Sequence, residues 1–279
     1  MNRRKSIRKI ILILGILILA YFGFMLIGGG FGKKPLNIRE INDDNSQFLF
    51  AHRGISAYYP ENTREAIEAA KLQGFKGLEI DIRKSSDNEF ILFHDEDGGR
   101  LLGVDSKIYD LSVAQIKEHR VLFDNVESGS YVLTLKEFLE EFKDDFVIYF
   151  DMKLKGWKDV DELVNIIQSD EISRSTIIAS TSASVVFHIE CKYPDINTAL
   201  EGFNAGKEWI YYLMPKNFKP DFLSGLASKV NEDHIEWLQK RDLLSIRIVY
   251  GVDSTNYQSL VNLGLKNMIV DYYPNLQIQ

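Results

Sequence analysis

Short apolar runs rich in β-branched and aromatic residues alternate with amphipathic helical patterns through most of this 279-residue chain. The predicted strands are Phe48–His52, Gly77–Ile82, Phe90–His94, Phe146–Met152, Thr176–Ser180, Ile196–Leu200, Phe222–Leu226, Leu243–Tyr250 and Asn267–Asp271. The predicted helices are Thr63–Gln73, Leu135–Phe142, Val160–Gln168, Ser184–Cys191, Glu232–Arg241 and Tyr257–Leu263. Alternation of this kind over about 230 residues is typical of a parallel α/β fold.

The number of predicted strands favours a closed (β/α)8 TIM barrel. The second and third strands are joined by a polar segment in which Asp87-Asn88 is typical of a hairpin turn. If these two strands count as one barrel strand with an excursion, eight barrel strands remain. Eight is the number that closes such a barrel. The polar stretch Asp95–Lys107 is then expected to be a loop over the barrel mouth. The aromatic-rich stretch Gly202–Lys219 is compatible with a lid, a membrane-surface contact or ordinary packing.

A charge-free segment of eighteen residues, Ile10–Ile27, precedes the predicted barrel. As a helix it is about 27 Å long, enough to cross a slightly thin bilayer. Five basic residues and no acid precede it, so the positive-inside rule predicts a cytoplasmic N-terminus and an extracytoplasmic domain at the cell membrane. A cleaved secretory signal is the alternative, but no Ala-x-Ala site follows Ile27, which favours a retained anchor. We therefore predict a cytoplasmic tail at 1–9, a single transmembrane helix at 10–30, a linker at 31–46 and the barrel at 47–279.

The charge balance and the cysteine count exclude several classes of partner and site. The formal net charge is −7, and removing the five cations of residues 1–9 leaves −12 for the remainder. A domain with this much negative charge is expected to bind nucleic acid or anionic lipid surfaces poorly in a non-specific way. The single cysteine, Cys191, excludes an intrachain disulfide and a thiolate metal cluster, and we expect it to be a small buried apolar residue.

Acidic side chains alternate with apolar ones along two predicted strands. Glu79 and Asp81 share one face of the first, and Asp151 shares a face with Lys153 on the other. A solvated strand would give the same pattern, but the strands of a parallel barrel are covered on both sides. Inward-facing carboxylates then need a cation, and oxygen donors without cysteine suit a divalent ion such as Ca²⁺ or Mg²⁺.

Two histidines, His52 and His94, each end a predicted strand. General acid–base catalysis needs one group that accepts a proton and one that gives a proton, and two imidazoles at strand ends are able to supply the pair. The residues leave the direction of this assignment open. The remaining histidines, His119, His188 and His234, lie in helical or loop contexts and are predicted to be structural or surface residues.

The polar motifs follow one another in a distinctive order. They are His-Arg-Gly at 52–54, Pro-Glu-Asn-Thr at 60–63, Glu-Ile-Asp at 79–81, His-Asp at 94–95 and Asp-Met-Lys at 151–153. This series, over Phe48 to Pro274, resembles the glycerophosphodiester phosphodiesterase family, and the first four motifs match without substitution. The resemblance implies a TIM barrel in which His52 and His94 are the acid–base couple. It also implies that Glu79, Asp81 and Asp151 hold a divalent metal.

Three further residues are predicted to act around the phosphate. Arg53 presents a planar, permanently charged fork to phosphate oxygens, and Lys153 adds a point charge. Glu61 is expected to orient Arg53 or the substrate, while Pro60 forms a turn and Asn62 or Thr63 caps the following helix.

The chain departs from the family pattern at two places. Asp151 stands where a Glu is more usual, which shortens that ligand by one methylene. Near the C-terminus Val270 replaces the usual Thr, and the preceding strand lacks the usual Trp-Thr-Val-Asn, so Arg247 or Tyr250 is the candidate to stand near the missing aromatic residue. Substrate choice is therefore less constrained by the resemblance than reaction type.

The resemblance implies a metal-dependent hydrolase that cleaves a glycerophosphodiester to glycerol phosphate and an alcohol. Either water or a neighbouring substrate hydroxyl is the nucleophile. A lysophospholipid or a wall polymer of glycerol phosphate is an alternative substrate. A non-catalytic, membrane-tethered receptor for phosphorylated ligands is the alternative outside the enzyme class, and it is favoured only by Asp151 and the altered penultimate strand.

Overall fold

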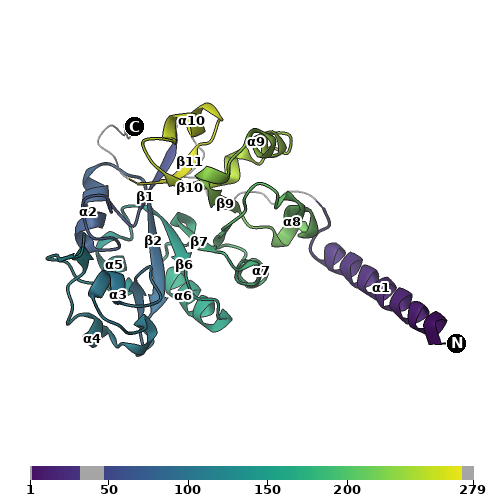
Figure 1. Cartoon of the computed structure of the whole chain (residues 1–279), viewed down its shortest axis with the longest axis horizontal. Coiled ribbons are helices and arrows are strands. Elements are labelled where there is room, and N and C mark those ends of the chain that lie inside the picture. The colour runs from purple at the N-terminus through teal and green to yellow at the C-terminus, as the bar shows by residue number, and fades with distance from the viewer. Residues whose placement is uncertain (1, 32–46, 272–279) are drawn as a thin grey trace.

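The computed structural model describes residues 2–31 and 47–271. Its main body is a barrel of parallel strands surrounded by helices, and one long N-terminal helix projects from it (Figure 1). Most of the predicted linker, 32–46, and the last residues of the predicted barrel, 272–279, lie outside the described residues.

Eight parallel strands close the barrel within the described residues. They are β1 (Phe48–His52), β2 (Gly77–Lys84), β6 (Val147–Met152), β7 (Thr176–Ser180), β8 (Asn197–Leu200), β9 (Phe222–Leu226), β10 (Arg247–Val252) and β11 (Asn267–Val270). Strand β1 pairs with β11 on one side and with β2 on the other, which completes the ring. The predicted (β/α)8 barrel is confirmed.

Helices cover the outside of the barrel because each strand is followed by a segment with an apolar stripe. They are α2 (Arg64–Leu72), α5 (Leu135–Phe142), α6 (Trp157–Ser169), α7 (Ala183–Lys192), α8 (Glu208–Leu213), α9 (Glu232–Gln239) and α10 (Tyr257–Asn262). Thr63 caps α2, and Thr134 with Glu137 forms a capping box at α5. Phe138 of α5 packs against Phe150 of β6, and both side chains are buried.

The excursion after β2 is larger than a hairpin. Strand β3 (Phe90–Leu92) pairs antiparallel with β2, as the Asp87-Asn88 turn predicts. The segment that follows contains α3 (Gly99–Leu102), η1 (Ile108–Asp110), α4 (Val113–Ile116), β4 (Leu122–Phe123) and β5 (Val126–Glu127). These elements have two to four residues, too few to show a period in the sequence, and they pack around a small apolar cluster that includes Phe93 and Ile108.

Two details of the sequence prediction are wrong. Cys191 is exposed, because it lies on the outer side of α7 while Val185 and Ile189 face the barrel. The predicted strand Leu243–Tyr250 begins with a 3-10 turn, η5 (Leu244–Ile246), and β10 starts only at Arg247. The run of apolar residues there continues through the turn, so hydrophobicity alone does not mark the boundary.

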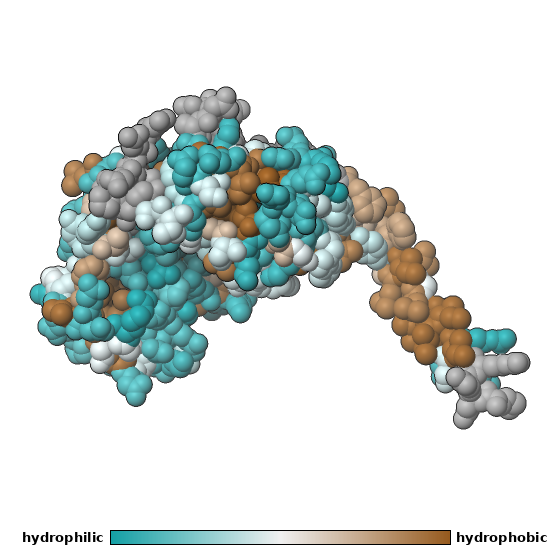
Figure 2. Space-filling view, turned by 45° about the horizontal axis from the view of Figure 1, so that its top comes forward, coloured by the Kyte–Doolittle hydropathy of each residue, from teal (hydrophilic) through white to brown (hydrophobic). Residues whose placement is uncertain are grey.

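By length and composition, helix α1 (Asn2–Ile27) is able to cross a membrane over the span Lys5–Ile27. It forms a hydrophobic rod that leaves a mostly hydrophilic body (Figure 2). Its last turn packs on the barrel: the Phe24 ring stacks on Phe218 with centroids 5.6 Å apart, and Met25 is only 2% exposed. Figure 1 shows the end of α1 next to α8.

Replacing Phe150 with Ala should destabilise the barrel by about 3–5 kcal/mol, because a fully buried aromatic side chain leaves a cavity between β6 and α5. Thermal unfolding of the full chain in detergent, at matched concentration, measures the loss. Leu72→Ala is the control, because Leu72 is 85% exposed at the end of α2 and should change stability by less than about 0.5 kcal/mol. Equal midpoints for the two variants would contradict the packing described here.

Candidate active site at the mouth of the barrel

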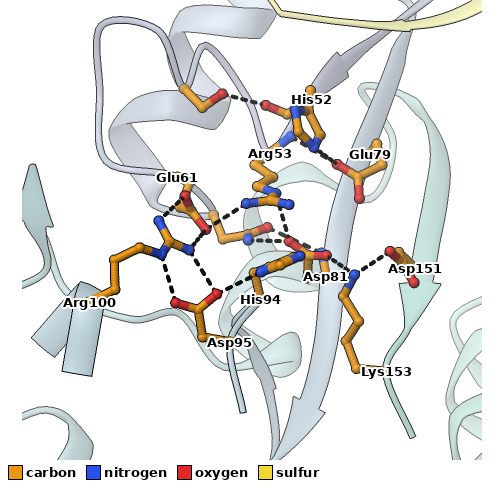
Figure 3. Close-up of polar contacts among 12 residues, drawn as sticks. His52, Arg53, Glu61, Glu79, Asp81, His94, Asp95, Arg100, Asp151 and Lys153 are labelled. Carbon is orange, nitrogen blue, oxygen red and sulfur yellow. Dashed lines mark hydrogen bonds and ion pairs between the residues drawn. The ribbon is translucent and has the colours of Figure 1, made fainter. Parts of the chain in front are cut away.

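The sequence-predicted side chains converge where the barrel strands end (Figure 3). His52 ends β1 and lies beside Glu79 of β2 in the strand register, and Asp81 of β2 lies beside Asp151 of β6. The carboxyl ends of parallel strands open on one face of a barrel, which is where such folds carry their polar sites. The register thus places side chains from three strands at one mouth.

Three carboxylates form the centre of the site. Oxygens of Glu79, Asp81 and Asp151 lie within 4.8 Å of one another. Glu79 is 3% exposed and Asp81 is fully buried. Burial, together with the negative charge of Asp81, holds the pKa of Glu79 well above its usual range, and burial also raises the pKa of Asp151. The trio is therefore short of positive charge and could hold a metal ion, because carboxylate oxygens are the donors that hard divalent ions prefer.

Two cations partly balance the trio. The Lys153 ammonium pairs with Asp81 at 2.8 Å and with Asp151. The Arg53 guanidinium reaches Asp81 at 3.0 Å and donates to Glu61 at 2.9 Å. Although burial opposes it, these two cations lower the pKa of Asp81. The neighbouring carboxylates in turn raise the pKa of Lys153 and Arg53 against the effect of burial, so both side chains stay charged.

The segment after β1 turns sharply to bring Arg53 into the site. Arg53 itself has a φ of 55°, and Gly54 has a φ of 82°. A Cβ on Gly54 would lie 2.5 Å from the backbone of Ala66, so only glycine fits where the turn passes α2. In this conformation the Arg53 amide donates to Glu79 Oε2 at 3.0 Å. The His-Arg-Gly motif thus combines an imidazole, a guanidinium and a turn.

Asn62 binds Asp81, and the cap of α2 falls to Thr63 alone. The Asn62 amide donates to Asp81 Oδ2 at 2.8 Å, and its oxygen accepts from the Asp81 amide at 3.2 Å. Asn62 is 2% exposed and has a φ of 58°, a conformation that asparagine tolerates better than most residues. The Pro-Glu-Asn-Thr motif therefore orients a carboxylate of the trio as well as starting a helix.

Each of the two predicted catalytic histidines is held by a carboxylate at Nδ1. His52 Nδ1 lies 2.7 Å from Asp271 Oδ1, and His94 Nδ1 lies 2.7 Å from Asp95 Oδ1. His52 Nε2 lies 3.9 Å from Glu79. A carboxylate at Nδ1 favours the tautomer that carries its proton there, which leaves Nε2 as the nitrogen that faces the site.

The partners of these histidines were missed by the sequence analysis. Asp271 is 219 positions from His52, and only its place at the end of the last predicted strand, Asn267–Asp271, could have indicated it. Asp95 belongs to the His-Asp motif, but the sequence predicted no function for it.

A third missed residue, Arg100, links the excursion to the Pro-Glu-Asn-Thr segment. Its guanidinium donates to Asp95 at 2.7 Å and to both Glu61 oxygens at 2.8 Å. Although burial opposes it, the hydrogen bonds from Arg100 and His94 lower the pKa of Asp95 to about 2. Glu61, predicted to orient Arg53, does contact Arg53 and is shared with Arg100. No sequence spacing marks this pairing, because it depends on how the excursion folds back.

A fourth carboxylate, Glu201, directly follows β8 and faces Asp151. The Tyr149 hydroxyl donates to its Oε1 at 3.0 Å. Burial, with the nearby charge of Asp151, raises the pKa of Glu201 from 4.5 to about 8. Tyr250 belongs to the same part of the site, because burial, Glu201 and Asp151 raise its pKa. Arg247, the other candidate near the missing aromatic residue, is fully buried and donates to the Phe203 and Leu223 carbonyls instead.

Residues 52–271 match the model of the glycerophosphoryl diester phosphodiesterase family. Human glycerophosphodiester phosphodiesterase 1 is 29% identical over 158 residues, which cover 54% of this chain and 47% of that protein. The matches span less than half the length of most of the curated relatives.

Two solved phosphodiesterase structures share the fold. The glycerophosphodiester phosphodiesterase from Thermotoga maritima is 26% identical with a TM-score of 0.63, and the match covers 81% of this chain and 94% of that one. A phosphodiesterase from Oleispira antarctica, solved with the product sn-glycerol-3-phosphate, is 19% identical with a TM-score of 0.70, covering 80% and 92%.

Replacing Glu201 with Gln should make the stability of the folded chain decrease less as the pH rises. The raised pKa lets the folded chain keep this proton up to about pH 8, whereas the unfolded chain loses it near 4.5, so the folded state is progressively less favoured between these values. The neutral amide removes that dependence. Unfolding midpoints at pH 5 and pH 8, measured in chelator, should therefore show a larger gain at pH 8. The exposed Glu68→Gln serves as control, and an equal gain at both values would contradict the assignment.

Proposed function

Because this chain belongs to the glycerophosphoryl diester phosphodiesterase family, we propose that it hydrolyses glycerophosphodiesters to glycerol phosphate and an alcohol. The observation that carries the proposal is the meeting, at one barrel mouth, of a carboxylate trio and two imidazoles whose Nδ1 atoms are both held by carboxylates. The Oleispira antarctica structure, with sn-glycerol-3-phosphate as product, supports the same product class here.

His52 and His94 are the acid–base couple of this proposal. One Nε2 accepts the proton of the attacking hydroxyl, and the other Nε2 gives a proton to the departing alcohol oxygen. Asp271 and Asp95 keep the two rings oriented and stabilise whichever ring becomes positive, as a carboxylate does for a catalytic imidazole in other hydrolases. His52 ends β1 and His94 follows β3, so the two imidazoles come from separate segments of the chain.

Arg53 and Lys153 bind the phosphate in this proposal. Both side chains are positively charged at neutral pH, and their acidic neighbours stabilise that charge. Both lie beside Asp81. Glu61 positions the Arg53 fork through its hydrogen bond and is itself held by Arg100. Charge that builds up on the phosphate oxygens during the reaction is thereby met by preorganised donors.

Glu79, Asp81 and Asp151 are the residues that would hold a divalent ion, Ca²⁺ or Mg²⁺. The fit rests on the donor set: three clustered carboxylates, two of them almost fully buried, where burial and the negative charge of Asp81 raise the pKa of Glu79. When bound, such an ion polarises a phosphate oxygen and lowers the pKa of a hydroxyl next to it. The Asp151 side chain is one methylene shorter than the usual Glu, and the Lys153 ammonium already pairs with it. Among the three carboxylates, we therefore expect the side-chain length at this position to affect ion binding most.

We propose that α1 is a retained anchor, with the N-terminus in the cytoplasm and the barrel, from about residue 47, outside the cell membrane. The contacts of Phe24 and Met25 with the barrel support retention, since a cleaved signal has no need of them. A substrate derived from membrane lipid or from a wall polymer suits this location. A free glycerophosphodiester, a lysophospholipid and polyglycerol phosphate are the three substrates to compare.

Replacing His52 or His94 with Ala should lower turnover of the preferred substrate by at least about 100-fold, because each change removes one proton-transfer group. The full chain in detergent is assayed on glycerophosphocholine, lysophosphatidylcholine and polyglycerol phosphate. His119→Ala, on a surface turn, should keep parental activity, and all three variants should remain folded to within about 1 kcal/mol. A parent that hydrolyses none of the three would instead favour a receptor.

Removing divalent ions with a chelator should abolish turnover, and adding back Ca²⁺ or Mg²⁺ should restore it, because the carboxylate trio is otherwise under-neutralised. Asp151→Asn should raise the ion concentration needed for half-maximal rate, while Asp151→Glu should keep or lower it. Ion titrations of the initial rate measure both effects. Full activity after exhaustive chelation would show that the trio has another role.

A further inference from the structure

Helix α8 presents apolar and aromatic side chains to the outside of the barrel. Trp209, Tyr212 and Leu213 are 60%, 43% and 49% exposed. Their spacing of i, i+3 and i+4 puts them on one face of the helix, while Tyr211 on the other face is 6% exposed and packs against the domain. The catalytic proposal makes no use of this face, which we call the α8 aromatic face.

The α8 aromatic face adjoins the place where α1 joins the barrel. Leu213 precedes Pro215 by two residues, so their Cα atoms are at most about 7 Å apart. Pro215 closes on Gly28 so tightly that a Cβ on this glycine would lie 2.2 Å from it. The Lys216 amide donates to the Gly30 carbonyl and the Asn217 amide to the Gly28 carbonyl, both at 2.9 Å. The end of α1 and the segment after α8 are therefore one packed unit (Figure 1).

The length of α1 sets the depth at which this unit lies. The span Lys5–Ile27 has 23 residues. Its charge-free part, Ile10–Ile27, is roughly 27 Å long at about 1.5 Å per residue, close to the thickness of the hydrocarbon layer, and the basic residues before it lie at the other surface. Ile27 then lies at the outer hydrocarbon boundary, and Gly28 and Pro215 lie in the headgroup layer. Tryptophan and tyrosine favour this layer because one part of each ring is apolar and another is polar.

The surroundings of the α8 aromatic face suit lipid headgroups. The Arg241 guanidinium lies over the Tyr212 ring, 5.2 Å from its centroid, and the exposed Lys207 begins the helix. The Trp237 indole donates to the Tyr212 hydroxyl at 3.1 Å, which holds that ring in place. Cations beside aromatic rings are typical of helices that lie in the membrane interface.

We propose that the α8 aromatic face lies in the headgroup layer of the same bilayer that α1 spans. The proposal rests on α1 being a retained anchor. Contact at both α1 and α8 holds the barrel in one orientation to the membrane. The segment from Glu201 to Phe218 then connects the catalytic mouth, at Glu201, with the membrane contact, at α8 and Pro215.

The test uses the three tryptophans of the full chain in phosphatidylcholine vesicles. One variant, W157F/W237F, keeps only Trp209, and its matched control, W209F/W237F, keeps only Trp157, which is 54% exposed at the start of α6. Lipids brominated near the glycerol backbone should quench Trp209 emission about twofold, more than lipids brominated near the bilayer centre, since interfacial side chains lie at headgroup depth. Trp157 emission should stay within about a tenth of its value in unbrominated lipid.

Three outcomes would overturn the proposal, and they can be told apart. Unquenched Trp209 in a chain that resists alkaline extraction would leave α1 as an anchor and place the α8 aromatic face in water. Emission that depends on the protein-to-lipid ratio and not on bromine would assign the face to a second copy of the chain. Release of the chain by alkaline extraction would remove the anchor itself, and with it the premise. None of these readouts depends on hydrolysis.

Discussion

The burial of three carboxylates at one end of a barrel is the constraint on which the rest of the site depends. Glu79, Asp81 and Asp151 are removed from water by the strands that carry them, and such charges are costly unless they are paired and hydrogen-bonded. The surrounding polar residues offset this cost. Arg53 and Lys153 supply positive charge, and Asn62 donates a hydrogen bond to the Asp81 carboxylate and accepts one from the Asp81 backbone amide. The left-handed backbone conformation of Arg53 and Gly54 is tolerated because it brings the Arg53 guanidinium to Asp81.

Much of the fold and the centre of the site could be predicted from the sequence, because both follow from local periodicity. Apolar runs alternating with amphipathic helices indicated the barrel, and the closed ring of parallel strands confirms it. Alternation within two strands placed Glu79, Asp81 and Asp151 on inward faces, and their oxygens do lie together. The strand ends likewise placed His52 and His94 at the mouth, although the roles of these side chains stay predictions.

What the sequence did not indicate depends on contacts made only when the ring closes or the excursion folds back. Asp271 reaches His52 because β11 and β1 are neighbours, across 219 positions of chain. Arg100 reaches Glu61 because α3 lies over the mouth, and Glu201 meets Tyr149 across two strands. Cys191 was wrongly placed inside because α7 has a weak apolar stripe, so its composition did not say which side faces the barrel.

The excursion after β2 has its own small apolar cluster, separate from the main core. His94 follows directly from it, whereas His52 is part of the barrel ring. The two imidazoles thus belong to separately packed units, joined at the mouth by Arg100 between Asp95 and Glu61. The smaller unit has the smaller apolar cluster, so its local opening would take His94 away from the mouth while the barrel ring stays folded. Mild heating is therefore expected to separate the two imidazoles before the whole barrel melts.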